Sequence, residues 1–231
     1  MKQKIIVIGL GNFGGNLAIK LTQDGHEVFG VDVNTNKVNL ICSKIDHAIG
    51  IDTTEESSMA HLPFSDTDIV VIAIGEDIGA SISSTALIKK HFKGRLIARS
   101  ISPVHKTILQ AMEIHEIIEP ESEYALDLAN RILLKGATKS MDLYGDFEII
   151  EVIIPKKVVG KTLAELDIKN TYNIHIVTTI KRHGKENYLG GLAIDKQVYG
   201  ILRSTYVFEE GDLLLIFGIK ENIEKFINNN Y

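Results

Sequence analysis

Residues 4–34 read KIIVIGLGNFGGNLAIKLTQDGHEVFGVDVN, and this stretch decides the fold. A short apolar run meets three glycines in the spacing G-x-G-x-x-G, at Gly9, Gly11 and Gly14. An amphipathic segment follows, and a second apolar run leads to Asp32. A strand, a glycine turn, a helix and a second strand with an acid at its end form a βαβ unit of the dinucleotide-binding type.

Each part of this motif has a physical task. Gly9 permits the tight turn, Gly11 lets the backbone approach a pyrophosphate, and Gly14 lets the helix and strand pack closely. The phosphates would lie at the free N–H groups of the helix N-terminus. Asp32 would accept hydrogen bonds from ribose hydroxyls and repel the 2′-phosphate of NADP. A structural turn with an incidental acid explains fewer of these features than a nucleotide site does.

Short runs rich in Val and Ile alternate with segments of helical apolar spacing through the first half of the chain. The expected strands lie within 4–10, 26–33, 47–52, 68–75, 94–101 and 115–120, and the expected helices within 17–25, 36–45, 81–92 and 104–114. Apolar strands joined by crossover helices indicate a parallel sheet that is covered on both faces. We therefore predict an α/β fold with a Rossmann-like, doubly wound parallel sheet.

The chain changes character after Pro120. A strongly apolar helix is expected over 122–135 and needs a partner surface, and the small and polar residues of 136–146 indicate a domain boundary. Strands expected within 147–155, 173–182 and 205–219 and helices within 160–168 and 221–229 describe a small α+β C-terminal domain. We predict a nucleotide-binding domain at 1–120, a helix and linker at 121–142, and a C-terminal domain at 143–231.

Composition excludes several classes of protein. The net charge of -5 and the pI of about 5.9 argue against nucleic-acid binding. No apolar run approaches the roughly 20 residues of a membrane-spanning helix, so we expect a cytoplasmic location. The single cysteine, Cys42, has no disulfide partner in the chain and is expected to be buried in a helix. We also expect His175 to be a buried imidazole in an apolar strand.

Ligands of doubly wound folds lie outside the carboxyl ends of the strands. The candidates for the site are therefore the glycine loop with Asn12 and Phe13, and the residues that end or follow the strands: Asp32, Asn34, Lys37, Asp52, Thr53, Thr54, Gly75, Glu76, Arg99 and Glu121. Arg99 can meet a phosphate, and Glu121 can hold a cation beside it. Asp52 and the two threonines can equally cap a helix within 53–62, because these residue types favour helix N-termini.

No catalytic motif accompanies these candidates. The sequence has no nucleophile elbow, no Walker loop and no cysteine or histidine metal motif. A dehydrogenase needs a positioned proton donor and a basic residue that orients the substrate. We therefore favour a sensor that is not an enzyme, in which the ligand shifts a conformational equilibrium. A small NAD-dependent oxidoreductase and an adaptor protein with a vestigial motif remain as alternatives.

Several segments together resemble the cytoplasmic regulatory subunits of Trk/Ktr potassium-uptake systems, which contain RCK (KTN) domains. They are GLGNFGGNLA, VDVN with Lys37, DTTEES, VIAIGEDIGASISSTALIKK and IIEPESEYA, while GKTLAELDI and EEGDLLLIFGIKENIEKF resemble the C-terminal RCK domain. The resemblance covers nearly the whole chain. It implies a gating subunit that binds ATP, ADP or NAD(H) at the inner face of the cell membrane. It also implies a homodimer formed through the 121–142 segment, and an octameric ring beneath a membrane subunit that translocates potassium.

The resemblance assigns roles to particular positions. Gly9, Gly11 and Gly14 match the phosphate loop, Asp32 the ribose acid, Asn34 and Lys37 the adenosine side, and Asp52, Thr53, Thr54 and Gly75 the neighbouring loops. Glu121 matches an acid associated with a nucleotide-bound Mg²⁺ or Ca²⁺. Asn12 departs from the pattern, because several ATP-responsive relatives carry an arginine there that reaches the terminal phosphate in the partner subunit. Asparagine has no charge, so weaker discrimination of ATP from ADP is expected, and NAD(H) or AMP-like ligands stay open.

The C-terminal domain of some relatives binds cyclic di-AMP at a dimer interface. The corresponding residues here are Leu166, Asp167, Ile168, Lys169, Asn170, His175 and Ile176. Lys169 stands where an arginine is usual in the family. With lysine in place of this arginine, the resemblance implies a second ligand site, for cyclic di-AMP, in the C-terminal domain.

Overall fold

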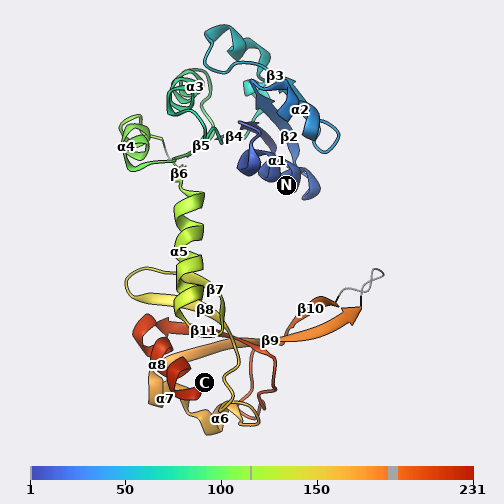
Figure 1. The fold of residues 1–231 in the computed structure, drawn as a ribbon. Coiled ribbons are helices and arrows are strands. Elements are labelled where there is room, and N and C mark those ends of the chain that lie inside the picture. The colour runs from blue at the N-terminus through green and yellow to red at the C-terminus, as the bar shows by residue number, and fades with distance from the viewer. Residues whose placement is uncertain (1, 115, 187–191) are drawn as a thin grey trace. The chain divides into compact units, whose positions relative to one another are not determined.

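The computed structural model describes residues 2–114, 116–186 and 192–231. The chain forms two compact units, Met1–Glu121 and Ser122–Tyr231. The first unit runs from blue to green in Figure 1, and the second continues from there to red. Within the described residues, no helix has the length and apolar character needed to span a membrane.

The first unit is built on a six-stranded sheet with the strand order β3-β2-β1-β4-β5-β6 (Figure 1). Its strands are β1 (Lys4–Ile8), β2 (Glu27–Asp32), β3 (His47–Gly50), β4 (Ile69–Ile72), β5 (Arg95–Arg99) and β6 (Glu116–Ile118), and all of them pair in parallel. Its helices are α1 (Asn12–Gln23), α2 (Thr35–Ile41), α3 (Ile78–His91) and α4 (Pro103–Ala111), with the 3-10 helices η1 (Glu56–His61) and η2 (Phe64–Asp66). The predicted Rossmann-like, doubly wound sheet is confirmed, and the strand order reverses between β1 and β4.

The central strands are apolar on both faces because helices cover both faces. Val7 of β1 packs in one buried cluster with Ala18 of α1. The next residue, Ile8, points to the opposite face and packs in a second cluster with Ile88 of α3 and Leu109 of α4. Successive side chains of a strand alternate between faces, so a continuous apolar run is what a doubly covered strand requires.

Two glycines allow α1 to begin directly against the strand ends. Gly9 has a φ of +90°, and a Cβ there would lie 2.8 Å from the backbone nitrogen of Ile74. A Cβ on Gly14 would lie 1.9 Å from the carbonyl oxygen of Gly9. Only glycine fits at either position. The helix consequently begins at Asn12, earlier than the apolar spacing predicts.

Two local expectations for the first unit differ from the structure. The helix expected within 53–62 is the short 3-10 helix η1, which no side chain caps. Cys42 was expected to be buried in a helix, and this prediction is wrong, because Cys42 is exposed directly after the last residue of α2. Val38 and Ile41 occupy the buried side of this short helix, so the following position faces away from the core.

The second unit is an antiparallel sheet with the strand order β10-β9-β11-β8-β7 and several short helices. Its strands are β7 (Ala137–Asp142), β8 (Phe147–Ile153), β9 (Ile174–Glu186), β10 (Leu192–Val198) and β11 (Leu213–Ile219). Its helices are α5 (Pro120–Leu133), which begins at the boundary between the units, α6 (Leu163–Leu166), α7 (Ile168–Tyr172) and α8 (Lys220–Asn230). The predicted small α+β domain is confirmed.

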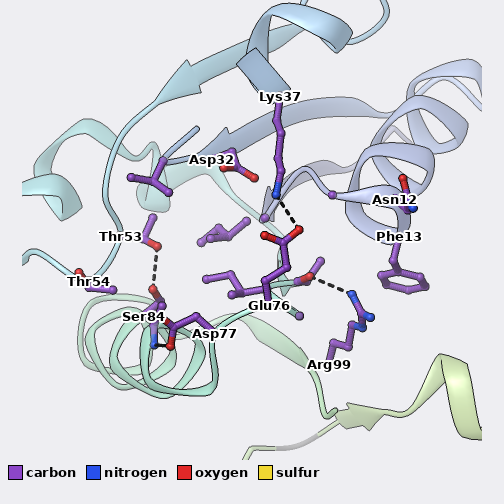
Figure 2. Close-up of a pocket in the computed structure, with 18 of the residues that line it drawn as sticks. Asn12, Phe13, Asp32, Lys37, Thr53, Thr54, Glu76, Asp77, Ser84 and Arg99 are labelled. Atoms are coloured by element: carbon purple, nitrogen blue, oxygen red, sulfur yellow. Dashed lines mark hydrogen bonds and ion pairs between the residues drawn. The ribbon is translucent and has the colours of Figure 1, made fainter. Parts of the chain in front are cut away.

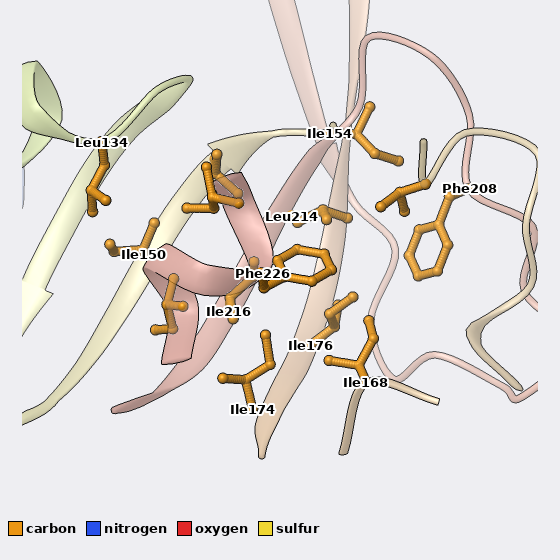
Figure 3. Close-up of a cluster of buried hydrophobic side chains, with 14 of the residues drawn as sticks. Leu134, Ile150, Ile154, Ile168, Ile174, Ile176, Phe208, Leu214, Ile216 and Phe226 are labelled. Atoms are coloured by element: carbon orange, nitrogen blue, oxygen red, sulfur yellow. The ribbon is translucent and has the colours of Figure 1, made fainter. Parts of the chain in front are cut away.

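The core of the second unit lies between its sheet and α8. Figure 3 shows Phe226 of α8 among Ile150, Ile176 and Ile216, which come from β8, β9 and β11. Phe226 is 1% exposed, and removing such a ring from a core typically costs about 3–5 kcal/mol. This packing gives the second unit a core of its own.

The edge strands of this sheet are the elements that the sequence did not predict. The expected boundary at 136–146 contains β7, and no strand was expected where β10 lies. Strand β7 has the sequence ATKSMD, and none of its residues is buried. An edge strand with no buried face lacks the apolar alternation by which strands are recognised.

Glu148 of β8 is a buried carboxyl group in the second unit. It is 1% exposed, and neither carboxylate oxygen has a hydrogen-bond partner within the described part of the chain. Burial raises the pKa of Glu148 above its ordinary value of 4.5, Lys220 opposes this shift, and Asp142 and Glu224 add to it. The folded protein therefore retains this proton at pH values at which an unfolded chain has lost it.

We predict that Glu148→Gln changes the pH dependence of stability. The protonated Glu148 side chain contributes to the free energy of unfolding below pH 4.5, the ordinary pKa of a glutamate. This contribution is lost as the pH rises through the raised pKa of Glu148 in the folded state. Glutamine stays neutral, so the free energy of unfolding of the variant should match the wild type in acid and exceed it above neutrality. Urea denaturation across this pH range measures the difference, with the exposed Glu210→Gln as the control. Parallel pH profiles of wild type and Glu148→Gln would contradict the prediction.

Candidate functional site

A cavity of about 400 Å³ lies in the first unit at the carboxyl ends of the parallel strands (Figure 2). The predicted site residues that line it are Gly9, Gly11, Asn12, Phe13, Asp32, Lys37, Asp52, Thr53, Thr54, Gly75, Glu76, Arg99 and Glu121. They come from loops that are far apart in the sequence. The common edge of a parallel sheet brings these loops together, as expected for a doubly wound fold.

Two of the predicted residues do not line the cavity. Gly14 lies in the contact between α1 and the turn at Gly9. The side chain of Asn34 accepts a hydrogen bond from the N–H of Asn36 at 2.9 Å and so caps α2. Gly14 and Asn34 thus fix the starts of α1 and α2 without lining the cavity themselves.

The sequence did not single out several residues that complete the lining. They are Ile8, Val33, Ala73, Ile74, Asp77, Ala80 and Ser84. Asp77 is the N-cap of α3, and Ala80 and Ser84 lie on that helix. The available signal was the position of α3, which follows β4 after the short segment 73–77 at the same edge of the sheet.

The N-terminus of α1 faces the cavity, and no side chain of the helix N-cap accepts a hydrogen bond from its free N–H groups. Its N-cap is Gly11, no side chain caps the helix, and its first turn contains no acidic residue. A Cβ built on Gly11 would meet no atom within 4 Å, so the space in front of this backbone is open. An uncapped helix N-terminus with open space in front of it fits a phosphate group.

Asp32 connects two loops of the cavity. One of its carboxylate oxygens accepts the N–H of Leu10 at 2.7 Å, and the other accepts the N–H of Asn34 at 2.7 Å. The side chain lines the cavity, although the residue is only 8% exposed. Because each carboxylate oxygen can accept a second hydrogen bond, Asp32 retains acceptor capacity for hydroxyl groups.

We predict that Asp32→Ala destabilises the protein even without ligand. The variant leaves the N–H groups of Leu10 and Asn34 without their acceptor, and one buried unpaired donor costs about 1–3 kcal/mol. Denaturation in urea measures this loss. Asp24→Ala is the matched control, because it removes an exposed carboxylate from a surface ion pair with Lys20 and should change stability by less than about 1 kcal/mol. Equal stabilities of the two variants would contradict the role given to Asp32.

Arg99 presents a guanidinium group to the cavity. It lies 5.6 Å from the centre of the Phe13 ring and directly against Gly75, where a Cβ would approach its Nη1 to 2.4 Å. It donates hydrogen bonds to Glu121 and, at 3.4 Å, to the carbonyl oxygen of Ala73. Its Nε is buried and has no acceptor among the described residues. The guanidinium group of Arg99 lines the cavity, and its positive charge fits an anionic ligand there.

A second ion pair crosses the cavity. Lys37 of α2 and Glu76, which follows β4, meet at 3.0 Å, as the dashed line in Figure 2 shows. Glu76 is 83% exposed, so water screens this pair strongly. The contact can open without a large loss of stability.

The third loop is ordered by its own hydrogen bonds. Asp52 accepts the N–H of Thr54 at 2.9 Å and its hydroxyl at 2.7 Å, and these bonds lower the pKa of Asp52. Asp52 therefore stabilises a turn, and it does not cap η1. The hydroxyls of Thr53 and Ser84 form a buried hydrogen bond of 2.7 Å, which ties this loop to α3.

The described residues contain no group of three or more His, Cys, Asp or Glu side chains that could hold a metal ion. Glu121, the candidate for a nucleotide-associated cation, is paired with Arg99. A cation at Glu121 would thus need further ligands from the nucleotide itself.

The second unit has a smaller cavity of about 190 Å³. It is lined by Leu163, Ala164, Asp167, Ile168, Lys169, Ile174, His175 and Ile176, whereas the predicted Leu166 and Asn170 lie outside the lining. The expectation that His175 is buried is wrong, because its side chain is on the exposed side of β9 while Ile174 and Ile176 face the core.

Comparison with known proteins identifies the family. The model of the TrkA-N domain matches residues 5–120. The chain is 32% identical to the Ktr system potassium uptake protein C of Bacillus subtilis over 226 residues, which are 98% of this chain and 96% of that protein. It is 30% identical to the Ktr system potassium uptake protein A of the same organism over 226 residues, with the same coverage.

Solved structures agree on the fold. The GsuK RCK domain superposes with a TM-score of 0.62 at 16% identity, over 100% of this chain and 48% of that chain. A structure described as the GsuK channel bound to NAD gives a TM-score of 0.62 at 16% identity, over 98% of this chain and 39% of that chain. This chain thus spans less than half of each of these proteins. Together with the family model and the Bacillus relatives, these matches show that the chain belongs to the Trk/Ktr family of potassium-uptake regulatory subunits, with its TrkA-N domain in the first unit.

Proposed function

We propose that this protein is a cytoplasmic subunit that senses an adenine nucleotide and controls the flux of potassium through a membrane partner. The observation that carries the proposal is the cavity of the first unit, where an uncapped helix N-terminus, an acid and a guanidinium group line one space. The names of the relatives support the potassium system, because they are Ktr potassium uptake proteins. The GsuK channel bound to NAD supports a nucleotide ligand on the same fold.

In this proposal the ligand spans the cavity along the sheet edge. The ribose hydroxyls donate to Asp32, which retains acceptor capacity, and the adenosine lies toward Lys37 and the Asp52 to Thr54 loop. The phosphates accept hydrogen bonds from the N-terminus of α1 and from the guanidinium group of Arg99, which lines the cavity. ATP, ADP and NAD(H) share the adenosine and the pyrophosphate that these groups recognise.

The ligand acts here by binding, without a chemical reaction. The residues known to line the cavity include no histidine, cysteine or tyrosine, and both of its cations, Lys37 and Arg99, are already paired with carboxylates. An NAD-dependent oxidoreductase, the alternative function, would also need a substrate site that faces the nicotinamide ring. A nucleotide that prefers one conformation by about 1–3 kcal/mol suffices to change transport several-fold.

Assembly is the second part of the proposal. Helix α5 carries Tyr124, Leu126, Leu128, Ile132 and Leu133 as exposed apolar side chains, and the last two are 74% and 78% exposed. An apolar helix surface of this kind favours association with another protein surface. We propose that α5 and the following segment form a homodimer, and that the dimers assemble into an octameric ring beneath the membrane subunit.

Two further ligands belong to the proposal through the family resemblance. Mg²⁺ or Ca²⁺ would bind beside Glu121 together with the nucleotide phosphates. Cyclic di-AMP would bind at the smaller cavity of the second unit, where Asp167, Lys169 and His175 supply its polar groups. Thermal-shift measurements with cyclic di-AMP alone, and with the nucleotide in the presence and absence of Mg²⁺, separate these two sites.

Gly11→Ala tests the nucleotide site without disturbing the fold. The φ of Gly11 is -66°, which every residue adopts, and a Cβ there meets no atom within 4 Å. We expect the stability to change by no more than about 1 kcal/mol. Affinity for NAD⁺ and for ATP should fall at least about tenfold, which corresponds to about 1.4 kcal/mol, because the methyl group occupies the phosphate position. Isothermal titration calorimetry measures the affinities.

Two variants of α1 serve as controls for this experiment. Gln23→Ala lies at the exposed end of the same helix and should leave binding unchanged. Gly14→Ala should lower stability, because its Cβ would lie 1.9 Å from the carbonyl oxygen of Gly9. Unchanged affinity in a folded Gly11→Ala variant would contradict the nucleotide site.

The ring is tested by Ile132→Asp on the exposed face of α5. Light scattering should give an oligomeric mass for the wild type and a smaller mass for the variant, since a buried unpaired carboxylate weakens an apolar interface. Glu123→Ala on the same helix is the control. A wild-type mass of one chain, 25.6 kDa, would contradict the proposed assembly.

A further inference from the structure

The cavity of the first unit has more acidic than basic side chains. Its ionisable lining residues are Asp32, Asp52, Glu76, Asp77 and Glu121 on the acidic side, and Lys37 and Arg99 on the basic side. Both cations are already paired with carboxylates of the same lining. Asn12, at the start of α1, contributes no charge. A polyanionic ligand therefore enters a cavity whose own charge is negative.

The charge of Asp77 is not needed for the fold. Asp77 is the N-cap of α3, where its side chain accepts the N–H of Ala80 at 2.9 Å. Asparagine caps helices about as well as aspartate, because both supply the same acceptor oxygen. The negative charge at this position is thus available to act on whatever occupies the cavity.

Glu76 acts on the ligand in two ways. It adds a negative charge to the lining, and it holds the ammonium group of Lys37 at 3.0 Å. The residue before it, Gly75, lies against the guanidinium of Arg99, so Glu76 and Asp77 directly follow the point where an anionic group would be bound. Glu76 and Asp77 thus line the same cavity as Arg99, Glu76 beside Lys37 and Asp77 at the start of α3.

Adenine nucleotides differ in how much negative charge they bring to this place. ADP and ATP end in a terminal phosphate, which carries more charge than a phosphate that is esterified on both sides. The two phosphates of NAD⁺ are both esterified in this way, and its nicotinamide ring is cationic. Like charges that share one cavity repel, and a bound ligand displaces part of the water that screens Glu76 in the free protein, so each additional negative charge on the ligand weakens binding.

We propose that Glu76 and Asp77 determine the ligand preference of the cavity, and that they favour a nicotinamide dinucleotide over ADP or ATP. This inference rests on the proposed nucleotide site. In it, the carboxylates select by repulsion of a terminal phosphate, while the glycine loop and Asp32 bind the part that all adenine nucleotides share. Asp77 is not part of that shared recognition, and Glu76 contributes to it only through its ion pair with Lys37.

The test is calorimetry on the full chain with the double variant Glu76→Gln and Asp77→Asn. Without Mg²⁺, the wild type should bind NAD⁺ at least about tenfold more tightly than ATP. In the double variant the affinity for ATP should rise about tenfold, while the affinity for NAD⁺ should change by less than about threefold. Asp24→Asn removes a carboxylate outside the cavity lining and should leave both affinities unchanged.

The outcomes separate the inference from the proposed function. Tighter binding of ATP than of NAD⁺ by the wild type, with or without Mg²⁺, would overturn the inference and leave the nucleotide site standing. An equal gain for both ligands in the double variant would also overturn it, since the carboxylates would then not discriminate. If neither the wild type nor the variant binds any of these nucleotides, the proposed function itself fails.

Discussion

The carboxylate of Asp32 holds the first unit in the form that creates its cavity. By accepting the N–H groups of Leu10 and Asn34, it joins the glycine loop after β1 to the turn after β2. The first loop leads into α1, and the second leads into α2, which carries Lys37. The positions of the open helix N-terminus and of one cavity cation thus depend on a single buried acid. The same acid retains acceptor capacity on the side of the cavity.

Around Asp32, the cavity combines rigid and exchangeable contacts. The contacts of Gly9 and Gly14 fix the start of α1, because no side chain fits at either glycine. The hydrogen bond between Thr53 and Ser84 is buried and likewise fixed. The ion pairs of Lys37 and Arg99, in contrast, have partners that are largely exposed to water. Such pairs contribute little to stability, so they can be replaced by contacts to a ligand at little cost.

Sequence patterns predicted the parts of the structure whose physical signal is periodic. The parallel sheet follows from apolar strands that alternate with helices, and the rule that ligands lie at the carboxyl edge selected most of the residues lining the cavity. Asp77 was missed because a helix cap has the same sequence signature wherever the helix lies. The edge strand β7 was missed because its sequence, ATKSMD, lacks the alternation of a half-buried strand. For His175 the position in an apolar run was known, but the face of the strand on which it lies depends on register.

Glu121 lies where the chain leaves the first unit, so its ion pair with Arg99 connects the cavity to the first turn of α5. Glu121 lines the cavity and lies in the first turn of α5, the helix that begins at Pro120. Its carboxylate is stabilised there by the positive end of the helix as well as by Arg99. A phosphate and Glu121 would compete for the same guanidinium N–H groups. A phosphate bound to Arg99 would displace Glu121 from its ion pair, and Glu121 belongs to the first turn of α5, the helix with which the chain leaves the first unit.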